Sequence, residues 1–138
     1  MKIWKRNINL QDINHNMKNT LASHLGIKIT VIEDNLLEGE MLVKDFLKQP
    51  YGIVHGGASV VLAETLGSLA SNLCIEDNLS TVGLDINANH IRAVTKGLII
   101  GRTQSIHLGR STHVWEIKLF NEDKLTCISR LTMAILKR

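Results

Sequence analysis

The sequence predicts an α+β domain in which an antiparallel β-sheet wraps around one long central helix. Three observations lead to this class. One segment, residues 58–74, has the spacing of apolar residues that is typical of a long helix. Six other segments are rich in β-branched residues or alternate between apolar and polar side chains, as strands do. The connections are short and no strand–helix–strand alternation occurs, which favours antiparallel pairing over a doubly wound sheet.

The chain before the long helix predicts two weak helical turns and a β-hairpin. The helical turns are expected at residues 10–17 and 20–25. Glu33-Asp34-Asn35 has the composition of a turn, so the strands on either side of it, 27–32 and 37–43, are expected to pair as a hairpin.

The chain after the helix predicts four more strands, at residues 81–89, 97–104, 113–120 and 124–136. Alternation is clearest in the last two of these. Asn121-Glu122-Asp123 is expected to join these two strands as a tight hairpin.

Within the helix, one face is predicted to meet the core and the opposite face to admit a ligand. At about 100° per residue, four leucines fall within about 40° of one another and form a stripe: Leu62, Leu66, Leu69 and Leu73. Glu64 lies about 200° from this stripe. Its predicted neighbours are mostly small and would let a ligand approach closely: Gly57, Val60, Gly67, Ser68 and Ser71.

Glu64 is the only Asp, Glu, Lys or Arg between Lys48 and Glu76. A carboxylate in such an apolar stretch costs stability, which indicates a functional reason for it. The alternative, an ordinary solvent-facing stripe, stays open from the helix alone. An ordinary exposed face, however, usually carries charged or amide side chains at several positions, and this one carries two serines.

Length and composition limit the possible functions. A chain of 138 residues has the size of one domain, so we expect residues 1–138 to form a single domain. The net charge of +3 favours an anionic partner. Nucleic acid is disfavoured, because the basic residues are scattered and two Trp, two Phe and one Tyr are too few for a stacking surface.

Neither a metal site nor a membrane segment is expected. Cys74 and Cys127 lie far apart and form no Cys/His metal spacing, so we expect two buried thiols. The basic N-terminus is followed by no apolar segment of the length that a signal peptide needs, and no stretch of about 18 apolar residues occurs. We therefore expect a cytoplasmic protein that does not bind membranes.

The loop before the helix has features of an oxyanion site. Gly56 and Gly57 let the backbone bend sharply at the helix N-terminus, where unpaired N–H groups and the helix dipole favour a negative oxygen. Gln49 precedes Pro50, which favours an extended backbone and makes its amide a candidate second donor. A glycine-rich helix start with a structural His55 is the alternative.

The spacing of Gly57 and Glu64, seven residues, places both on one face of the helix, two turns apart. A thioester or ester carbonyl held at the helix N-terminus would then face the carboxylate, so that base and oxyanion donors come from one helix. No GxSxG or HExxH motif occurs, so a serine nucleophile elbow and a zinc-protease site are not indicated.

Three motifs resemble those of a known family: QPYG at residues 49–52, HGGASVVLAE at 55–64 and GLDINANH at 83–90. Together they resemble the hotdog-fold acyl-CoA thioesterases, and the similarity extends over nearly the whole chain. It is greatest to the branch acting on aromatic acyl-CoA, which includes the 1,4-dihydroxy-2-naphthoyl-CoA hydrolases of menaquinone biosynthesis and the enterobactin proofreading thioesterases. The resemblance implies one hotdog domain over residues 1–138.

The resemblance also implies catalytic roles. Glu64 matches the family's catalytic carboxylate, and the sequence leaves open whether it acts as a general base or as a nucleophile. Gly56 matches the residue whose N–H polarises the thioester carbonyl, and Gln49 and His55 match its active-site neighbours. The remaining matches, which line the acyl pocket or orient water in the family, are Thr65 and Ser68.

Further matches imply a CoA site and an oligomer. The CoA-binding positions are Gly83, His90, Ile91, Arg92, Ala93, His107, Leu108, Gly109, Arg110, Ser111 and Thr112. Arginine forms bidentate, charge-assisted bonds to phosphates, although Arg110 stands one residue earlier than the family's arginine. In the family the site lies between two subunits, with Gln49 and Glu64 expected from different chains, and dimers pair into tetramers.

The function expected from the residues and the resemblance together is hydrolysis of an aromatic, naphthoyl- or benzoyl-type acyl-CoA without metal or redox cofactor. Tyr51, Ser68 and Leu69 are expected to border the acyl pocket. Two alternatives stay open: a hydratase or dehydratase of acyl thioesters on the same fold, using His55 and Glu64, and a module that binds acyl-CoA without turnover.

Overall fold

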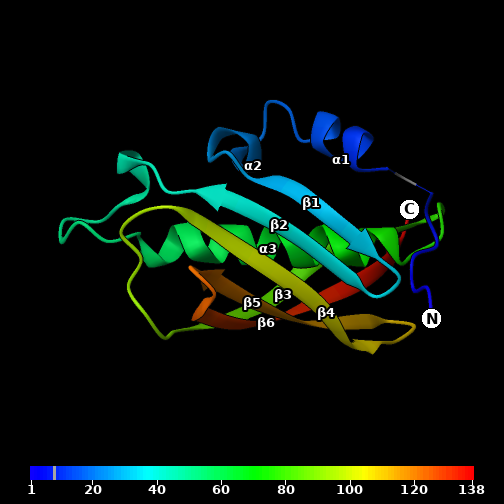
Figure 1. The fold of residues 1–138 in the computed structure, drawn as a ribbon. Coiled ribbons are helices and arrows are strands. Elements are labelled where there is room, and N and C mark those ends of the chain that lie inside the picture. Colours follow the sequence, from blue (N-terminus) through cyan, green and yellow to red (C-terminus); the bar gives the residue numbers. More distant parts are fainter. Residues whose placement is uncertain (8) are drawn as a thin grey trace.

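The computed structural model describes residues 1–7 and 9–138, and it has the predicted α+β architecture (Figure 1). The long helix α3 spans Gly56–Leu73, and one six-stranded sheet curves around it. Helices α1 (Leu10–Asn16) and α2 (Leu21–His24) confirm the two helical turns. A short 3-10 helix, η1 (Asp45–Leu47), was not predicted.

The sheet is antiparallel throughout, in the order β1-β2-β4-β5-β6-β3, so β1 and β3 are its edges. Each predicted strand is confirmed: β1 (Lys28–Glu33), β2 (Leu36–Leu42), β3 (Leu79–His90), β4 (Leu98–Leu108), β5 (Thr112–Asn121) and β6 (Lys124–Lys137). Strand β4 runs four residues further than predicted, because a bulge between Ser105 and His107 interrupts its alternation.

The concave face of the sheet packs on α3 through Leu62, Leu66 and Leu73, which are buried as predicted. The prediction that Gly67 and Ser71 share the face of Glu64 is wrong. A Cβ on Gly67 would lie 2.5 Å from Leu131 Cδ2, so this glycine lets the sheet approach the helix closely. The buried stripe of α3 therefore includes small residues as well as leucines, whereas Leu69 is only partly buried.

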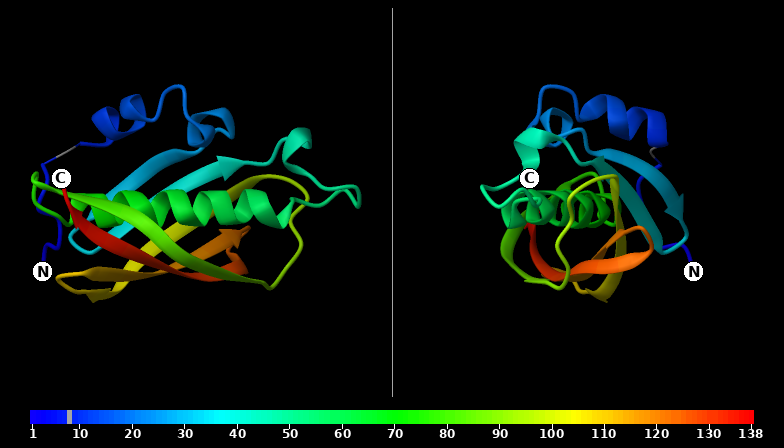
Figure 2. Two further views of the ribbon diagram at one scale, coloured as in Figure 1. Left: turned by 180° about the vertical axis from the view of Figure 1, so that it is seen from behind. Right: turned by 60° about the vertical axis from the view of Figure 1, so that its left-hand side comes forward.

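Helices α1 and α2 lie along the side of α3 that the sheet leaves open (Figure 2). Asn14 fixes α1 to the edge strand β1: its Nδ2 donates to the Ile29 carbonyl at 2.9 Å, and its Oδ1 accepts from the Ile29 N–H at 2.9 Å. Helix α2 contacts α3 directly. These contacts bring the N-terminal segment to the face of α3 that carries Glu64.

Candidate active site

The N-terminus of α3 presents a free backbone donor at Gly56. His55 is the N-cap, and its Nδ1 accepts a hydrogen bond from the Gly57 N–H at 2.8 Å. Because Nδ1 is an acceptor, the proton of the neutral ring lies on Nε2. Within the described part of the chain, the Gly56 N–H donates no hydrogen bond. This N–H, at the positive end of an 18-residue helix, is suited to bind a developing oxyanion.

The loop from Lys48 to Val54 holds Gln49 next to this helix end. Lys48 and Val54 form a β-bridge, and the Gln49 N–H donates to the Ile53 carbonyl at 2.9 Å. The Gln49 side-chain Oε1 accepts from the Tyr51 N–H. Because the oxygen of this amide is engaged, its Nε2 is the group left to donate, which agrees with the predicted role.

Gly56 and Gln49 line the same pocket, of about 320 Å³. The end of β3 and the segment after it form another wall of this pocket, with the predicted CoA-binding residues His90, Ile91, Arg92 and Ala93. The Ile91 N–H donates to the Thr126 carbonyl at 2.8 Å, which fixes this segment to β6. A Cβ on Gly56 would lie 2.9 Å from His90 Nε2, so only glycine fits here without displacing the imidazole.

Glu64 lies in the second half of the candidate site, a groove of about 540 Å³ on the open side of α3. Thr65, Ser68 and Leu69 also line it, and the Ser68 hydroxyl lies 3.7 Å from Met133 Sδ. Among the described residues that line the groove, Glu64 alone is charged. Tyr51 does not border this groove, because it lies 91% exposed on the loop before α3.

Gly83 of β3 lies against the Glu64 carboxylate. A Cβ at this position would be 3.2 Å from Glu64 Oε1, so the absence of a side chain makes room for the carboxylate. The structure thus places Gly83 beside the predicted catalytic group. Only β6 separates this part of β3 from the start of β5, where the second expected CoA segment ends.

Within one chain, the carboxylate and the oxyanion donors line different pockets. Gly56 and Glu64 are eight residues apart on α3, about 12 Å along its axis. A carbonyl oxygen bound to the Gly56 N–H cannot place its carbon next to the Glu64 carboxylate of the same chain over this distance. The expectation that one helix supplies both groups to one reaction centre is therefore not met.

The second predicted CoA segment lies at the other end of the molecule. His107 and Leu108 end β4, Gly109, Arg110 and Ser111 form the turn, and Thr112 begins β5. This hairpin lies beyond the C-terminal half of α3, away from the helix N-terminus (Figure 1). The structure therefore does not bring the two CoA segments together within one chain.

Two groups of residues near or behind the site were missed. The groove around Glu64 is completed by Met17, Thr20, Leu21 and Ala22. These residues lie in or next to the predicted helical turns, and no functional role was expected for them. Behind α3, Ser71 Oγ and His113 Nδ1 form a buried pair 2.7 Å apart. Burial lowers the pKa of His113, and the nearby charges of His107 and Lys5 lower it further. His113 stands two residues before Trp115 in the alternating pattern of β5, and this was the available signal.

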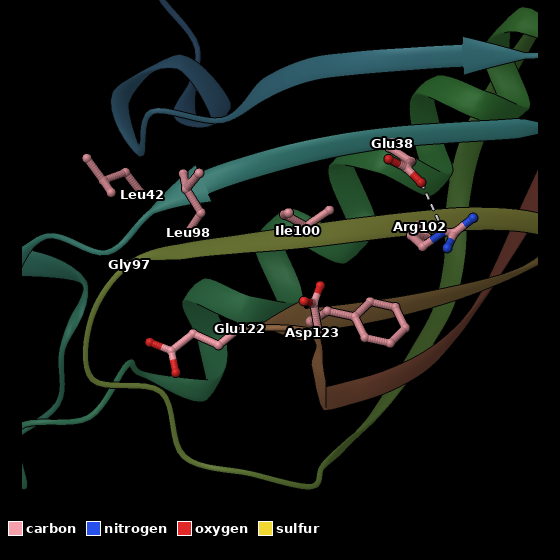
Figure 3. Close-up of a pocket in the computed structure, with 9 residues that line it drawn as sticks. Glu38, Leu42, Gly97, Leu98, Ile100, Arg102, Glu122 and Asp123 are labelled. Carbon is pink, nitrogen blue, oxygen red and sulfur yellow. Dashed lines mark ion pairs between the residues drawn. The ribbon is translucent and has the colours of Figure 1, made fainter.

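A larger pocket, of about 730 Å³, lies on the outer face of the sheet (Figure 3). Leu42, Leu98 and Ile100 line it, and an ion pair of Arg102 Nε with Glu38 Oε1, 3.0 Å long, crosses one end. It contains none of the predicted site residues. Size alone therefore does not identify the site.

The thiols of Cys74 and Cys127 are both buried and free, as predicted. In residues 1–7 and 9–138, no group of three or more His, Cys, Asp or Glu side chains is arranged to hold a metal ion. None of the helices in this described part combines the length and hydropathy needed to cross a bilayer.

Comparison with known proteins identifies the family. Residues 51–128 match the thioesterase superfamily. The 1,4-dihydroxy-2-naphthoyl-CoA hydrolase of Escherichia coli K12 is 47% identical over 135 residues, which cover 97% of this chain and 99% of that protein. A solved mutant thioesterase of Pseudomonas aeruginosa, with alanine in place of a glutamine, has a TM-score of 0.97 and 43% identity, covering 99% of this chain and 100% of that one.

A thioesterase of Staphylococcus aureus was also solved with alanine in place of a glutamine; it has a TM-score of 0.81 and 39% identity, covering 84% of this chain and 98% of that one. A second structure of the staphylococcal protein carries alanine in place of a glutamate. The family match, the identities and the shared architecture agree. The chain belongs to the thioesterase superfamily, has the hotdog fold and is a thioester hydrolase.

Proposed function

We propose that this chain hydrolyses the thioester of an aromatic acyl-CoA, of naphthoyl or benzoyl type, to the free acid and CoA. The observation that carries the proposal is the position of Glu64: a single carboxylate in a mostly apolar groove, beside a glycine that leaves room for it. The reaction needs a group that activates water, or attacks directly, next to a bound acyl chain. The E. coli relative supports a naphthoyl substrate by its name, which would place the reaction in menaquinone biosynthesis.

In the proposed mechanism, the Gly56 N–H and the Gln49 Nε2–H donate to the carbonyl oxygen as negative charge develops on it. Glu64 accepts a proton from water while the water oxygen attacks the carbonyl carbon, and the carbon–sulfur bond then breaks. The CoA thiolate leaves and takes up the proton. Alternatively, the Glu64 carboxylate attacks first and water cleaves the resulting anhydride; both routes remain part of the proposal.

The separation of the two half-sites supports a reaction centre shared by two chains. Strand β3 is an edge of the sheet, and its Val82 and Leu84 side chains are 46% and 61% exposed. If two copies pair antiparallel along β3, the His90 end of one strand lies near the Gly83 part of the other. The Gly56 and Gln49 of one chain would then approach the Glu64 of its partner.

The staphylococcal structures are consistent with Gln49 and Glu64 acting as a pair. The glutamine and the glutamate replaced in that protein are separated by the same number of positions as Gln49 and Glu64 here. We further propose that residues 1–138 act as one domain and that dimers pair into tetramers. The two CoA segments, at residues 90–93 and 107–112, would then come from different chains, with Arg92 and Arg110 as candidate phosphate ligands.

Replacement of Glu64 tests the proposal. The Glu64→Gln variant keeps the shape of the side chain and removes the base, so kcat for benzoyl-CoA and 1-hydroxy-2-naphthoyl-CoA is expected to fall by about 10²–10⁴-fold. Release of CoA thiol measures the rate. Glu40→Gln, a carboxylate of β2 outside both half-sites, is the matched control and should keep the parent rate. A Glu64→Gln enzyme as fast as the parent would overturn the assignment.

The hydratase alternative receives no support from the site. It would need His55 and Glu64 to act together on one substrate as acid and base. His55 Nδ1 already accepts the Gly57 N–H, so the other ring nitrogen of the neutral imidazole carries a proton and no free basic nitrogen is left. Loss of an enoyl absorbance without thiol release would favour the hydratase. Stoichiometric binding of benzoyl-CoA without either change would favour the binding module.

A further inference from the structure

The groove that contains Glu64 is formed by two segments that are far apart in the sequence. One wall is the exposed face of α3, with Val61, Glu64 and Leu69. The opposite wall is the segment from Met17 to Ala22, which lies between α1 and α2 and extends into α2. The surface of the groove as a whole is mostly apolar, so the groove suits an uncharged hydrocarbon or aromatic group.

The Met17–Ala22 wall is held in place by several contacts. The Thr20 hydroxyl donates to the Met17 carbonyl at 2.5 Å and accepts from the Ser23 N–H at 3.3 Å, so it both closes the turn and caps α2. Ala22 is buried, and its carbonyl accepts from the Ile27 N–H at 2.9 Å. With α1 fixed to β1 by Asn14, this wall has a defined position opposite Glu64.

The side chains that this wall offers can contact a ligand. Leu21 is 60% exposed and Met17 is half-buried, yet both line the groove. An exposed leucine at the first position of a short helix contributes little to the core of the folded chain. Methionine adapts to irregular shapes and its sulfur makes favourable contacts with aromatic rings.

We infer that the Met17–Ala22 segment forms the distal wall of the acyl-binding pocket, and that Met17 and Leu21 select the size of the acyl group whose carbonyl reacts beside Glu64. The inference rests on the proposed function and assigns an acyl-recognition role to a segment of the chain outside α3 and its preceding loop. Carrier recognition is separate from it, because no residue of the predicted CoA segments lines this groove.

A substitution that fills part of the groove with a larger side chain tests the inference. Leu21→Trp should narrow the groove while leaving Glu64 in place, so kcat/KM for 2-naphthoyl-CoA should fall at least about tenfold relative to that for propionyl-CoA. Leu42→Trp is the matched control, because Leu42 is 49% exposed on the outer face of the sheet and lies outside the groove. It should leave the ratio of the two kcat/KM values unchanged.

The outcomes separate this inference from the proposed function. If Glu64→Gln is inactive but Leu21→Trp keeps the parent ratio, the function stands and the inference fails. If the parent enzyme cleaves no acyl-CoA, the proposed function fails. The inference is then tested by an NMR titration with 2-naphthoate, in protein whose four methionines carry ¹³C-labelled methyl groups. A saturable shift of the Met17 methyl signal, with the fully buried Met41 unshifted, supports it, and an unshifted Met17 signal overturns it.

Discussion

Replacement of Gly83 by valine tests whether the position of the Glu64 carboxylate controls the rate. A Cβ at position 83 would lie 3.2 Å from Glu64 Oε1 and 3.9 Å from Met133 Sδ. The first distance is short enough that even alanine must displace the carboxylate by a few tenths of an ångström. The two methyl groups of valine extend further and should displace it by about 1 Å, and a misplacement of this size in a reacting group costs on the order of 10²-fold in rate.

The expected fall in kcat/KM is therefore about 10²-fold for Gly83→Val, equivalent to about 2.7 kcal/mol of transition-state stabilisation, and at most about tenfold for Gly83→Ala. Thiol release from benzoyl-CoA measures it. Gly83 is not among the glycines with positive φ, so a β-branched residue suits the backbone of this strand and the free energy of unfolding should not decrease.

Asn87→Val on the same edge strand is the control for this experiment. Asn87 is exposed and does not line the Glu64 groove, so its replacement adds a β-branched side chain without crowding the carboxylate. Urea unfolding of each variant establishes that it is folded. If folded Gly83→Val retained the parent kcat/KM, a carboxylate positioned beside Gly83 could not be the reacting group.

Three further predictions follow from single contacts. Gln49→Ala removes one oxyanion donor and should lower kcat by about 10²–10³-fold, whereas an unchanged kcat would exclude that role. His113 has a pKa below its ordinary 6.5 in the folded chain because it is buried, so as the pH falls below that value the unfolded chain binds the proton first. The free energy of unfolding should then decrease by up to about 1.4 kcal/mol per pH unit until the lowered pKa is reached, and urea titrations of His113→Gln should lack this dependence. Burial raises the pKa of Cys74 to about 12 and also raises the pKa of Cys127, so neither thiol should react with a disulfide reagent until the chain unfolds; a native protein that titrates one or two thiols would contradict this.

Most of the fold could be predicted because hydrophobic periodicity is strong where one face of an element is buried. Strands β5 and β6 alternate almost without interruption, and their predicted bounds differ from the observed ones by one residue or none at either end. The end of β4 was missed for the opposite reason. The bulge at Ser105 and His107 places successive side chains out of phase, so a prediction based on a period of two stops there.

The orientation of α3 was predicted only in part, because its small residues were expected on the exposed side. Gly67 and Ser71 are buried: one allows close approach of Leu131, and the other makes a hydrogen bond to His113. Neither contact can be recognised from the helix alone, since both partners come from strands more than forty residues later. The true open face combines Glu64 with Val61, Thr65 and Ser68, which helical spacing also permits.

Glu64 and Gly56 could be recognised as candidate site residues from the sequence because their signals are local. A single carboxylate in an uncharged stretch and a glycine at a helix start are both visible within a short window. The wall opposite Glu64 gives no comparable signal, because Met17 and Leu21 have the composition of any weak amphipathic turn. The role proposed for them depends on where Asn14 and β1 place them, which is a tertiary contact.

The geometry of α3 links the proposed catalysis to assembly. A helix that offers an oxyanion donor at its first residue and a carboxylate eight residues later holds these groups about 12 Å apart, too far for one carbonyl. Two antiparallel copies of the helix remove this separation, since the start of each then lies beside the middle of the other. The strand that would bring them together, β3, also carries Gly83 against Glu64 and ends at His90 against Gly56. In this arrangement the edge strand β3 positions the residues of both half-sites and brings the two chains together. A chain that fails to pair along β3 would therefore have all the proposed catalytic groups but no complete active site.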